Sequence, residues 1–442
     1  MADVRAFRGV RYSPAVVGSD VSALVCPPFD VISPDEQAAL YARHPRNFVH
    51  LELARGEGEV RYAQAAADYA AWMAEGTLVQ DPAPALYAER VSFTFDQHRY
   101  IRKGVVVALR LEPWETGQVR PHERTFAGPK QDRIKLMRAC GANFSPIWVL
   151  SVGRVEALQR LWGEIEDRVP DATARDADGA THELWACTDS DLALRVHQDF
   201  LGNPVYIADG HHRYETALAY REEALEQNGG EDASANFVMA YLVEGSDPGL
   251  TILGGHRLVR PPAGFHAEDL RRGLGDAFEF QERSGSASEI LAEVGLPRER
   301  PAFGVWSPSL GLTGIARLRG RGVPADLAGD HSEAWRSLDA SALQLLCLDR
   351  LFGSSADDLV RAGVLSYAYG IADALAVVAS GQATIAFLLT GTPSGAIFAV
   401  ADAADRMPEK STFFYPKPLT GMVMASLRGS VPSPDGETVT RL

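Results

Sequence analysis

The sequence predicts a mixed α/β protein, α+β in part, built from two domains. Short apolar runs rich in β-branched and aromatic residues alternate with longer segments whose apolar residues recur at helical spacing, which indicates strands interspersed with helices. The chain has 442 residues, more than one ordinary core accommodates. The dipeptide Pro261-Pro262 is the best boundary, so we expect one domain over residues 1–262 and a smaller α/β domain over residues 263–442.

The first segments predict helices followed by strands. Ser33 is expected to cap a helix whose first position is Pro34, because proline fits the first turn of a helix. A longer helix follows over residues 60–76, and strands are expected over residues 85–95 and 104–111. Residues 122–135 are dense in charge and predict a polar loop.

The central segments alternate between strands and helices. The segment Asn143-Phe144-Ser145-Pro146 leads into an apolar run that predicts a buried strand. The elements expected here are a strand over 147–152, helices over 158–169 and 189–200, a strand over 204–208, a helix over 214–227, and strands over 237–243 and 250–259. The last two strands are expected to pair across a turn at residues 245–249.

The C-terminal part repeats this mixture. Its expected elements are helices over 267–274, 286–294 and 339–352, strands over 302–306, 314–318 and 383–389, a helix from Ser394, and a last strand near 421–427. Between that helix and that strand lies the loop from Met407 to Lys417, which the second domain contributes.

Composition excludes several classes of protein. An apolar fraction of 46% and a charged fraction of 23% are typical of soluble globular proteins. Residues 1–12 carry charges and no apolar stretch, so no signal peptide is expected. The most hydrophobic zone, residues 364–389, is interrupted by Asp373 and Gln382, so no membrane span is expected.

Net charge and the spacing of the cysteines indicate which partners, cross-links and cellular location to expect. The net charge is −15, from 43 basic and 58 acidic residues, and no Lys/Arg cluster is present, so we expect no nucleic-acid partner. The four cysteines lie far apart and form no CxxC pair, which argues against a disulfide framework or a structural zinc site. A reducing cytoplasm is the expected location.

The segment Asp209-Gly210-His211-His212-Arg213 is the most informative of the chain. It joins a predicted buried strand to a predicted helix, with Asp209 as the expected N-cap. Two imidazoles and a guanidinium then fall in the first helical turn, where the positive end of the helix dipole disfavours cations. Such a strand-to-helix elbow predicts an anion site, most often for phosphate. A structural turn with solvated histidines is the alternative.

Two further segments contain more polar and charged side chains than folding alone requires. Glu123 lies between a histidine and an arginine and is a candidate general base, with a surface ion pair as the alternative. Lys410, Ser411 and Thr412 form a run in a proline-stiffened loop that suits phosphate or carboxylate, or serves only as a structural loop.

Common catalytic motifs are absent from the sequence. No GxSxG, HExxH, GxGxxG or GxxxxGK[ST] pattern occurs, which removes the usual hydrolase, zincin, Rossmann and P-loop interpretations. A metal site built from Asp209, His211 and His212 together with His122 and Glu123 is disfavoured, because adjacent histidines in one helical turn point about 100° apart. We therefore predict no protein-bound metal.

Four segments together resemble a bacterial and archaeal family known as domain of unknown function 1015. They are Cys26-Pro27-Pro28-Phe29-Asp30-Val31-Ile32-Ser33, Asn143-Phe144-Ser145-Pro146, Ile207-Ala208-Asp209-Gly210-His211-His212-Arg213-Tyr214 and the run from Met407 to Lys417. The resemblance spans nearly the whole chain. Membership of that family implies no particular activity.

The elbow is also similar to the phosphate-binding elbow of the ParB/sulfiredoxin superfamily, which includes free-serine kinases. This resemblance implies a ParB/sulfiredoxin-like core in the N-terminal half. It also implies that Gly210, His211, His212 and Arg213 hold nucleotide phosphates and that Glu123 is the base toward a substrate hydroxyl. No DNA-binding helix-turn-helix is identifiable, so a partition role is not expected.

The function expected from the sequence is phosphoryl transfer between a nucleoside triphosphate or diphosphate, with Mg²⁺, and a small hydroxylated metabolite, serine or phosphoserine first. Glu123 and His211 are the expected catalytic residues, and Asn143, Ser145 and Lys417 the expected substrate-binding residues. The expected phosphate-binding residues are Asp209, Gly210, His211, His212, Arg213, Lys410, Ser411 and Thr412. The alternatives are a regulatory protein that binds nucleotide without turnover, and a metal-dependent phosphohydrolase or nuclease.

Overall fold

The computed structural model describes residues 2–125, 127–228 and 230–434 and divides the chain into two compact units. The first unit comprises Met1–Leu250 and Pro416–Leu442, and the second comprises Thr251–Tyr415. The boundary expected after residue 262 therefore lies within the second unit, and the end of the chain returns to the first. Both units contain helices and sheets, which confirms the mixed α/β class.

The first unit is built on a nine-stranded mixed sheet in the order β6-β11-β8-β12-β5-β4-β10-β9, with β1 paired to β5. The strands are β1 (Val4–Arg5), β4 (Leu86–Phe95), β5 (His98–Arg110), β6 (Val119–Arg120), β8 (Ile147–Ser151), β9 (Ala172–Arg175), β10 (Thr181–Cys187), β11 (Val205–Asp209) and β12 (Phe237–Glu244). β12 runs parallel to β8 and antiparallel to β5, and β11 runs antiparallel to β8. The predicted strand at 204–208 is thus an internal strand, next to β8.

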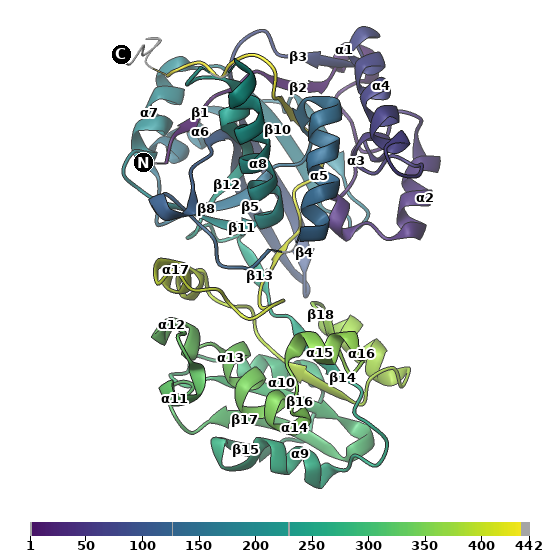
Figure 1. Cartoon of the computed structure of the whole chain (residues 1–442), viewed down its shortest axis with the longest axis vertical. Helices are drawn as coiled ribbons and strands as arrows, with labels where there is room; N and C mark the ends of the chain where they lie inside the picture. The colour runs from purple at the N-terminus through teal and green to yellow at the C-terminus, as the bar shows by residue number, and fades with distance from the viewer. Residues whose placement is uncertain (1, 126, 229, 435–442) are drawn as a thin grey trace. The chain divides into compact units, whose positions relative to one another are not determined.

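Helices pack on this sheet through a continuous apolar core. They are α1 (Pro14–Val17), α2 (Pro34–Arg43), α3 (Val49–Glu52), α4 (Val60–Ala74), α5 (Ala127–Cys140), α6 (Glu156–Ile165), α7 (Ser190–Phe200) and α8 (His211–Asn228). The core joins sheet residues such as Val107 and Ile207 to Leu161 of α6 and Tyr214 of α8. In Figure 1, α5 and α8 lie side by side across the sheet, and they are in contact. Ser33 caps α2 in a capping box with Glu36, as predicted.

A small four-stranded sheet ties the end of the chain to the first unit. Its order is β3-β2-β21-β7, with β2 at Gly9–Tyr12, β3 at Leu78–Gln80, β7 at Ala142–Asn143 and β21 at Met424–Ser426. β21 pairs with β2 on one side and with β7 on the other. Because β7 leads into the Phe144-Ser145-Pro146 turn, the C-terminal segment runs beside the approach to β8.

The second unit has its own six-stranded antiparallel sheet in the order β15-β17-β16-β19-β14-β18. Its strands are β14 (His256–Val259), β15 (Phe278–Glu282), β16 (Ala302–Ser307), β17 (Leu312–Leu318), β18 (Leu365–Ala368) and β19 (Ile385–Leu388), and β13 (Thr251–Leu253) pairs separately with β20 (Phe413–Tyr415). The helices are α9 (Ala267–Leu274), α10 (Ala287–Val294), α11 (Ala325–Ala328), α12 (Glu333–Arg336), α13 (Asp339–Leu343), α14 (Asp349–Phe352), α15 (Ala356–Arg361), α16 (Ile371–Ala379) and α17 (Ser394–Asp402). Its apolar core includes Ile290, Ile315 and Leu388.

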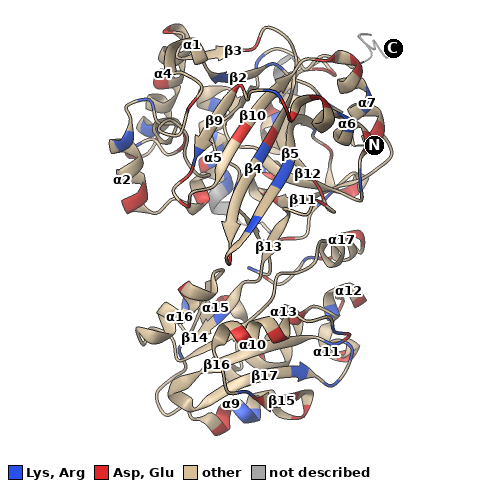
Figure 2. Ribbon diagram, turned by 180° about the vertical axis from the view of Figure 1, so that it is seen from behind, with Lys and Arg blue, Asp and Glu red and all other residues tan. Residues whose placement is uncertain are grey.

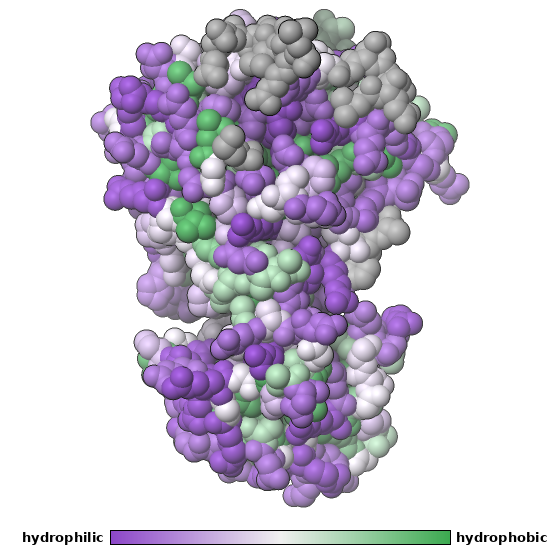
Figure 3. Space-filling model, turned by 60° about the vertical axis from the view of Figure 1, so that its left-hand side comes forward, coloured by the Kyte–Doolittle hydropathy of each residue, from purple (hydrophilic) through white to green (hydrophobic). Residues whose placement is uncertain are grey.

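Charged residues are dispersed over both units. Lys and Arg, and Asp and Glu, are scattered along the ribbons of both units in Figure 2. Hydrophilic residues cover most of the face seen in Figure 3, with hydrophobic residues in small groups. No helix of the described residues is long and apolar enough to cross a membrane.

One predicted loop is a helix. The charge-dense stretch 122–135 was expected to lack regular structure, but α5 begins at Ala127 and runs to Cys140. Pro129 lies in the first turn, where a missing N–H costs nothing. The charges pair with α8: Lys130 contacts Glu215, and Arg138 donates to Glu223 at 2.5 Å. The polar residues therefore form the contact between two helices.

One predicted hairpin is absent from the described structure. Residues 250–259 were expected to form a strand paired with 237–243, but they divide into β13 and β14, and β12 pairs with β5 and β8 instead. Gly254 and Gly255 separate the two short strands. A Cβ on Gly254 would clash with the carbonyl oxygens of Leu389 and Thr390, so this backbone approach breaks the strand.

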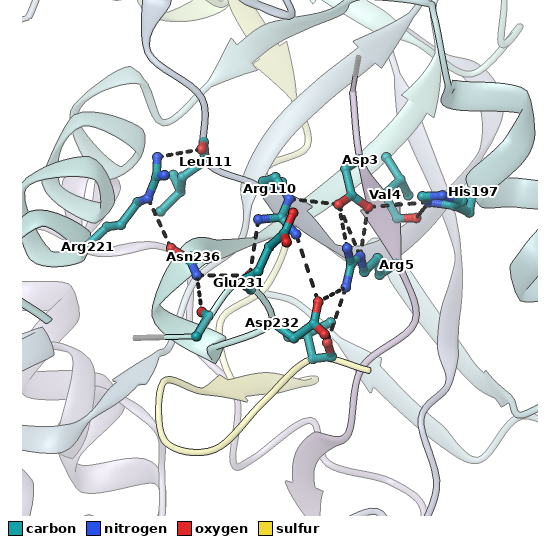
Figure 4. A network of polar contacts seen from close by, with 12 residues as sticks. Asp3, Val4, Arg5, Arg110, Leu111, His197, Arg221, Glu231, Asp232 and Asn236 are labelled. Atoms are coloured by element: carbon teal, nitrogen blue, oxygen red, sulfur yellow. Dashed lines mark hydrogen bonds and ion pairs between the residues drawn. The ribbon is translucent and has the colours of Figure 1, made fainter. Parts of the chain in front are cut away.

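A network of charges fixes the first strand to the large sheet (Figure 4). The Asp3 carboxylate accepts hydrogen bonds from Arg5 and from Arg110, both at 2.8 Å, and lies 3.3 Å from Nδ1 of His197 on α7. Arg5 also donates to Asp232 at 2.6 Å. Burial opposes ionisation of Asp3, but the hydrogen bonds from His197, Arg5 and Arg110 hold its pKa well below the usual range.

We expect Asp3→Asn to lower the free energy of unfolding at neutral pH by about 3 kcal/mol, because it removes one partner of a buried charge network. A depressed carboxyl pKa stabilises the fold above the unfolded pKa, and this stability is lost as the pH falls through the folded pKa. The difference between wild type and variant, measured by urea unfolding, should therefore shrink in acid. Glu166→Gln, at an exposed pair with Lys103, is the control and should cost less than about 1 kcal/mol. A pH-independent difference would contradict the assignment.

Candidate functional site

The elbow joins β11 to α8 through Gly210. A bulge at Ala208 shifts the register, since Ile207 pairs with Val149 and Asp209 with Trp148. Gly210 has φ +88°, a conformation that favours glycine. α8 begins at His211, and the Gly210 carbonyl accepts from Tyr214 N–H at 2.9 Å. Gly210 therefore occupies the N-cap position, which corrects the prediction that Asp209 caps the helix.

Asp209 instead holds two cations. Arg213 Nη2 donates to Asp209 Oδ2 at 2.5 Å, and Lys417 Nζ donates to Oδ1. Burial opposes ionisation, but the charges of Lys417 and Arg213 hold the pKa of Asp209 well below its usual range. Arg213 Nη1 also donates to the carbonyl oxygen of Pro146. The carboxylate is therefore a charged centre that joins the end of β11, the first turn of α8 and the C-terminal segment.

Two buried histidines, His122 and His211 of the elbow itself, lie in contact with each other. The exposed fraction is 0% for His122 and 3% for His211, and their rings meet edge to face with centroids 4.8 Å apart. His122 Nδ1 lies 2.7 Å from the carbonyl oxygen of Ile207, so this nitrogen carries the proton. The backbone N–H of His122 donates to His211 Nε2 at 3.3 Å, so the neutral ring of His211 carries its proton on Nδ1.

Glu123 lies against both rings. Its Oε2 is 3.6 Å from His211 Nδ1, and its Oε1 is 3.8 Å from His122 Nε2. The exposed fraction of the Glu123 side chain is 35%, so the carboxylate reaches solvent while lying near two buried imidazoles. The structure thus brings Glu123 and His211 together at the start of α8. General-base catalysis by Glu123 and a catalytic role of His211 stay predictions.

Glu215, which sequence reasoning missed, holds the Glu123 loop to α8. Its carboxylate accepts from Thr125 Oγ1 at 2.6 Å and from Lys130 Nζ. Burial opposes its ionisation, but these hydrogen bonds lower the pKa of Glu215. The only signal in the sequence was an acidic residue two positions after Arg213, within the predicted helix.

The predicted substrate-binding residues surround the elbow within the first unit. Asn143 Oδ1 accepts from the Met239 N–H at 3.2 Å, Ser145 Oγ donates to Glu52 at 2.8 Å, and Lys417 pairs with Asp209. These contacts are all to protein groups. Substrate binding by Asn143, Ser145 and Lys417 stays a prediction, as does phosphate binding by His212, which is half-buried in the first turn of α8.

The predicted residues Lys410, Ser411 and Thr412 belong to the second unit. Lys410 is exposed and has φ +54°, whereas the exposed fractions of Ser411 and Thr412 are 3% and 7%. Ser411 Oγ donates to Pro408 O at 2.6 Å and closes the turn. Of the three, Lys410 alone presents its side chain to solvent, and its role in phosphate binding stays a prediction.

Metal ligation was tested among the residues that the structure describes. There, no group of three or more His, Cys, Asp and Glu side chains is placed to hold a metal ion. The four cysteines are free and buried.

We expect Lys417→Met to lower the free energy of unfolding by about 3 kcal/mol, because it leaves the buried Asp209 carboxylate with one cation fewer. The double variant Asp209→Asn/Lys417→Met should lose less than the sum of the single losses, a coupling that chemical denaturation measures. Lys135→Met, at an exposed pair with Glu59, serves as the control. Additive losses would show that the two side chains do not interact.

Comparison with known proteins places the chain in a family. No curated protein matches it. Similar solved structures include a conserved hypothetical protein from Pyrococcus furiosus (TM-score 0.35, 12% identity, 73% of this chain and 95% of that chain). They also include a free serine kinase in complex with AMP (TM-score 0.35, 12% identity, 70% and 86%) and SbnI with C-terminal truncation from Staphylococcus aureus (TM-score 0.33, 12% identity, 74% and 87%). Likenesses at these TM-scores carry no functional argument. The family model described as "Protein of unknown function (DUF1015)" matches residues 4–341, so the chain belongs to that family.

Proposed function

We propose that this protein transfers a phosphoryl group from a nucleotide to the hydroxyl of a small metabolite, with serine the first acceptor to test and phosphoserine the product. The observation that carries the proposal is the position of Glu123. Its carboxylate is partly exposed, 3.6 Å from His211 at the first position of α8, and therefore stands beside the N-terminus of a helix. A base and an anion-binding element next to each other are what phosphoryl transfer to an alcohol requires.

The phosphate-binding part of the site is the start of α8. The first N–H groups of a helix have no partner within the helix, and the dipole adds positive potential there. Gly210 at φ +88° lets the backbone turn sharply into this helix, and His211 and His212 occupy its first two positions. Arg213 adds a guanidinium, held by Asp209, at the third. Mg²⁺ would accompany the nucleotide rather than a protein cage.

The chemistry assigned to the side chains is simple. Glu123 accepts the proton of the substrate hydroxyl as the oxygen forms a bond to the γ-phosphorus, and the bond from that phosphorus to the bridging oxygen breaks to release nucleoside diphosphate. His211 and His122 lie beside the carboxylate, and the helix N-terminus stabilises the charge on the transferred group. A protein that only binds nucleotide has no need of the base, so Glu123 separates catalysis from simple binding.

The first test is a thermal-shift screen of nucleotides with and without Mg²⁺. A ligand that binds the folded state raises its stability by mass action, by about 2.7 kcal/mol at a hundredfold excess over Kd. We expect at least one nucleoside triphosphate with Mg²⁺ to raise Tm by several degrees. Adenosine without phosphate is the matched control, and an equal shift with adenosine would place the affinity outside the elbow. Absence of any shift across the nucleoside triphosphates and diphosphates would refute nucleotide binding.

The second test concerns Glu123. We expect Glu123→Gln to lower kcat by about 10² to 10⁴ while nucleotide affinity stays close to that of the wild type, because the amide keeps the shape but accepts no proton. Turnover is followed by phosphorus NMR with the nucleotide that the screen identifies and serine as acceptor. Glu183→Gln, which alters a partly buried pair with Arg90 on β4 and β10, is the control. Near-wild-type turnover in Glu123→Gln would end the proposal, and equal loss of binding and turnover would make Glu123 a structural ion-pair partner.

A further inference from the structure

A buried carboxylate, Glu52, is linked by contacts to the elbow. It belongs to none of the motifs that the sequence analysis identified. Glu52 ends the short helix α3, and its exposed fraction is 3%. Ser145 Oγ donates to Glu52 Oε1 at 2.8 Å, and Arg133 Nη1 lies 3.4 Å from the same oxygen. Ser145 Oγ is also 2.7 Å from Thr420 Oγ1. We call Glu52, Arg133, Ser145 and Thr420 the support cluster.

The geometry of the support cluster is strongly specified. A buried carboxylate is costly unless it is paired and hydrogen-bonded, so Glu52 must keep its contacts. Arg133 is fixed as well, because it donates to the backbone oxygen of Glu52 at 3.1 Å, pairs with Asp132, and lies 4.1 Å above the Phe29 ring. The cluster is therefore a rigid anchor.

The anchor is connected to the elbow through two consecutive residues, Ser145 and Pro146. Ser145 precedes Pro146, and both the fixed φ of proline and the restriction that it places on the preceding residue leave little backbone freedom. The Pro146 carbonyl accepts from Arg213, whose guanidinium also holds Asp209. Contacts therefore run without interruption from Glu52 through Ser145, Pro146 and Arg213 to Asp209.

A small cavity lies along the same path. Its volume is about 40 Å³, and its lining combines polar residues, among them Glu52, Ser145 and Arg213, with apolar ones such as Leu136 and Phe144. Glu52 and Arg213 thus border one shared space.

We propose that Glu52 is a positioning residue for the elbow: by fixing Ser145 and the Pro146 carbonyl, it sets the place of Arg213 and of the helix N-terminus that binds phosphate. The inference rests on the proposed function for its ligand, but its structural part stands on the contacts alone. Glu52 touches no reacting group in this scheme and acts through Arg213.

Glu89 provides a matched control. Its exposed fraction is 2%, close to that of Glu52, and its carboxylate accepts from a buried histidine, His182 Nδ1, at 2.8 Å in the β4–β10 pair. Glu52→Gln and Glu89→Gln therefore remove similarly buried charges from the same unit, but Glu89 has no contact path to Arg213 among its hydrogen bonds. Ser145→Ala is a milder second variant that breaks the same path.

The test compares hydrogen exchange in residues 205–216 with the affinity for inorganic pyrophosphate and for ATP with Mg²⁺. We expect Glu52→Gln and Ser145→Ala to speed exchange across 205–216 and to weaken binding of both probes about tenfold, because small misplacements of binding groups have effects of this size or larger. Glu89→Gln should leave both unchanged even if it lowers Tm as much.

The outcomes separate the positioning role of Glu52 from the proposed function. Unchanged exchange in 205–216 in both Glu52→Gln and Ser145→Ala would overturn the positioning role, whatever the ligand. Equal effects from Glu89→Gln would reduce Glu52 to general stability and overturn it too. If the wild type binds neither pyrophosphate nor ATP, the proposed function fails, while faster exchange in Glu52→Gln still supports Glu52 as the residue that positions the elbow.

Discussion

The buried negative charge of Asp209 is the constraint on which the candidate site depends. Burial makes an unpaired carboxylate untenable, so this oxygen pair must keep two cations in place. One is Arg213, in the first turn of the helix that follows, and the other is Lys417, 208 residues away. The strand end, the helix start and the C-terminal segment are therefore fixed by one charge. Segments that resemble family motifs but lie far apart in the sequence meet because that charge requires them.

Local patterns predicted the elbow but not its partners. The run before Asp209 is short, apolar and β-branched, and the glycine after it marks a turn, so β11 and α8 followed from the sequence. Local reasoning then assigned Asp209 to the helix cap, because no pattern shows that a lysine 208 residues later will claim the carboxylate. Glu52 gave even less signal, since α3 is a four-residue helix without measurable periodicity. α5 was missed because its charges, which pair with α8, look like those of a solvated loop.

In the second unit, too, the sequence pattern did not reveal which contacts fix the conformation of the predicted loop. The prolines around Lys410 suggested a stiff loop, but the stiffness comes from elsewhere. Arg257, with an exposed fraction of 2%, donates to the carbonyl oxygens of Glu409 at 2.9 Å and Lys410 at 3.3 Å. Those bonds support the left-handed φ of +54° at Lys410, which is uncommon for a residue with a side chain. The buried hydroxyl of Ser411 shapes the turn, so the anion-binding capacity predicted for this loop now depends on the lysine.

The proposed role of Glu123 as a base draws on the two imidazoles beside it. In their neutral forms, backbone contacts place the proton of His211 on Nδ1, which faces Glu123, and the proton of His122 on Nδ1, so that its Nε2 is the nitrogen nearer Glu123. These nitrogens lie 3.6 Å and 3.8 Å from the Glu123 oxygens, which is longer than a hydrogen bond, so neither ring holds the carboxylate in a tight ion pair. A base must take up a proton and later give it back, and a partly exposed carboxylate between an N–H and an unprotonated ring nitrogen suits that proposed task.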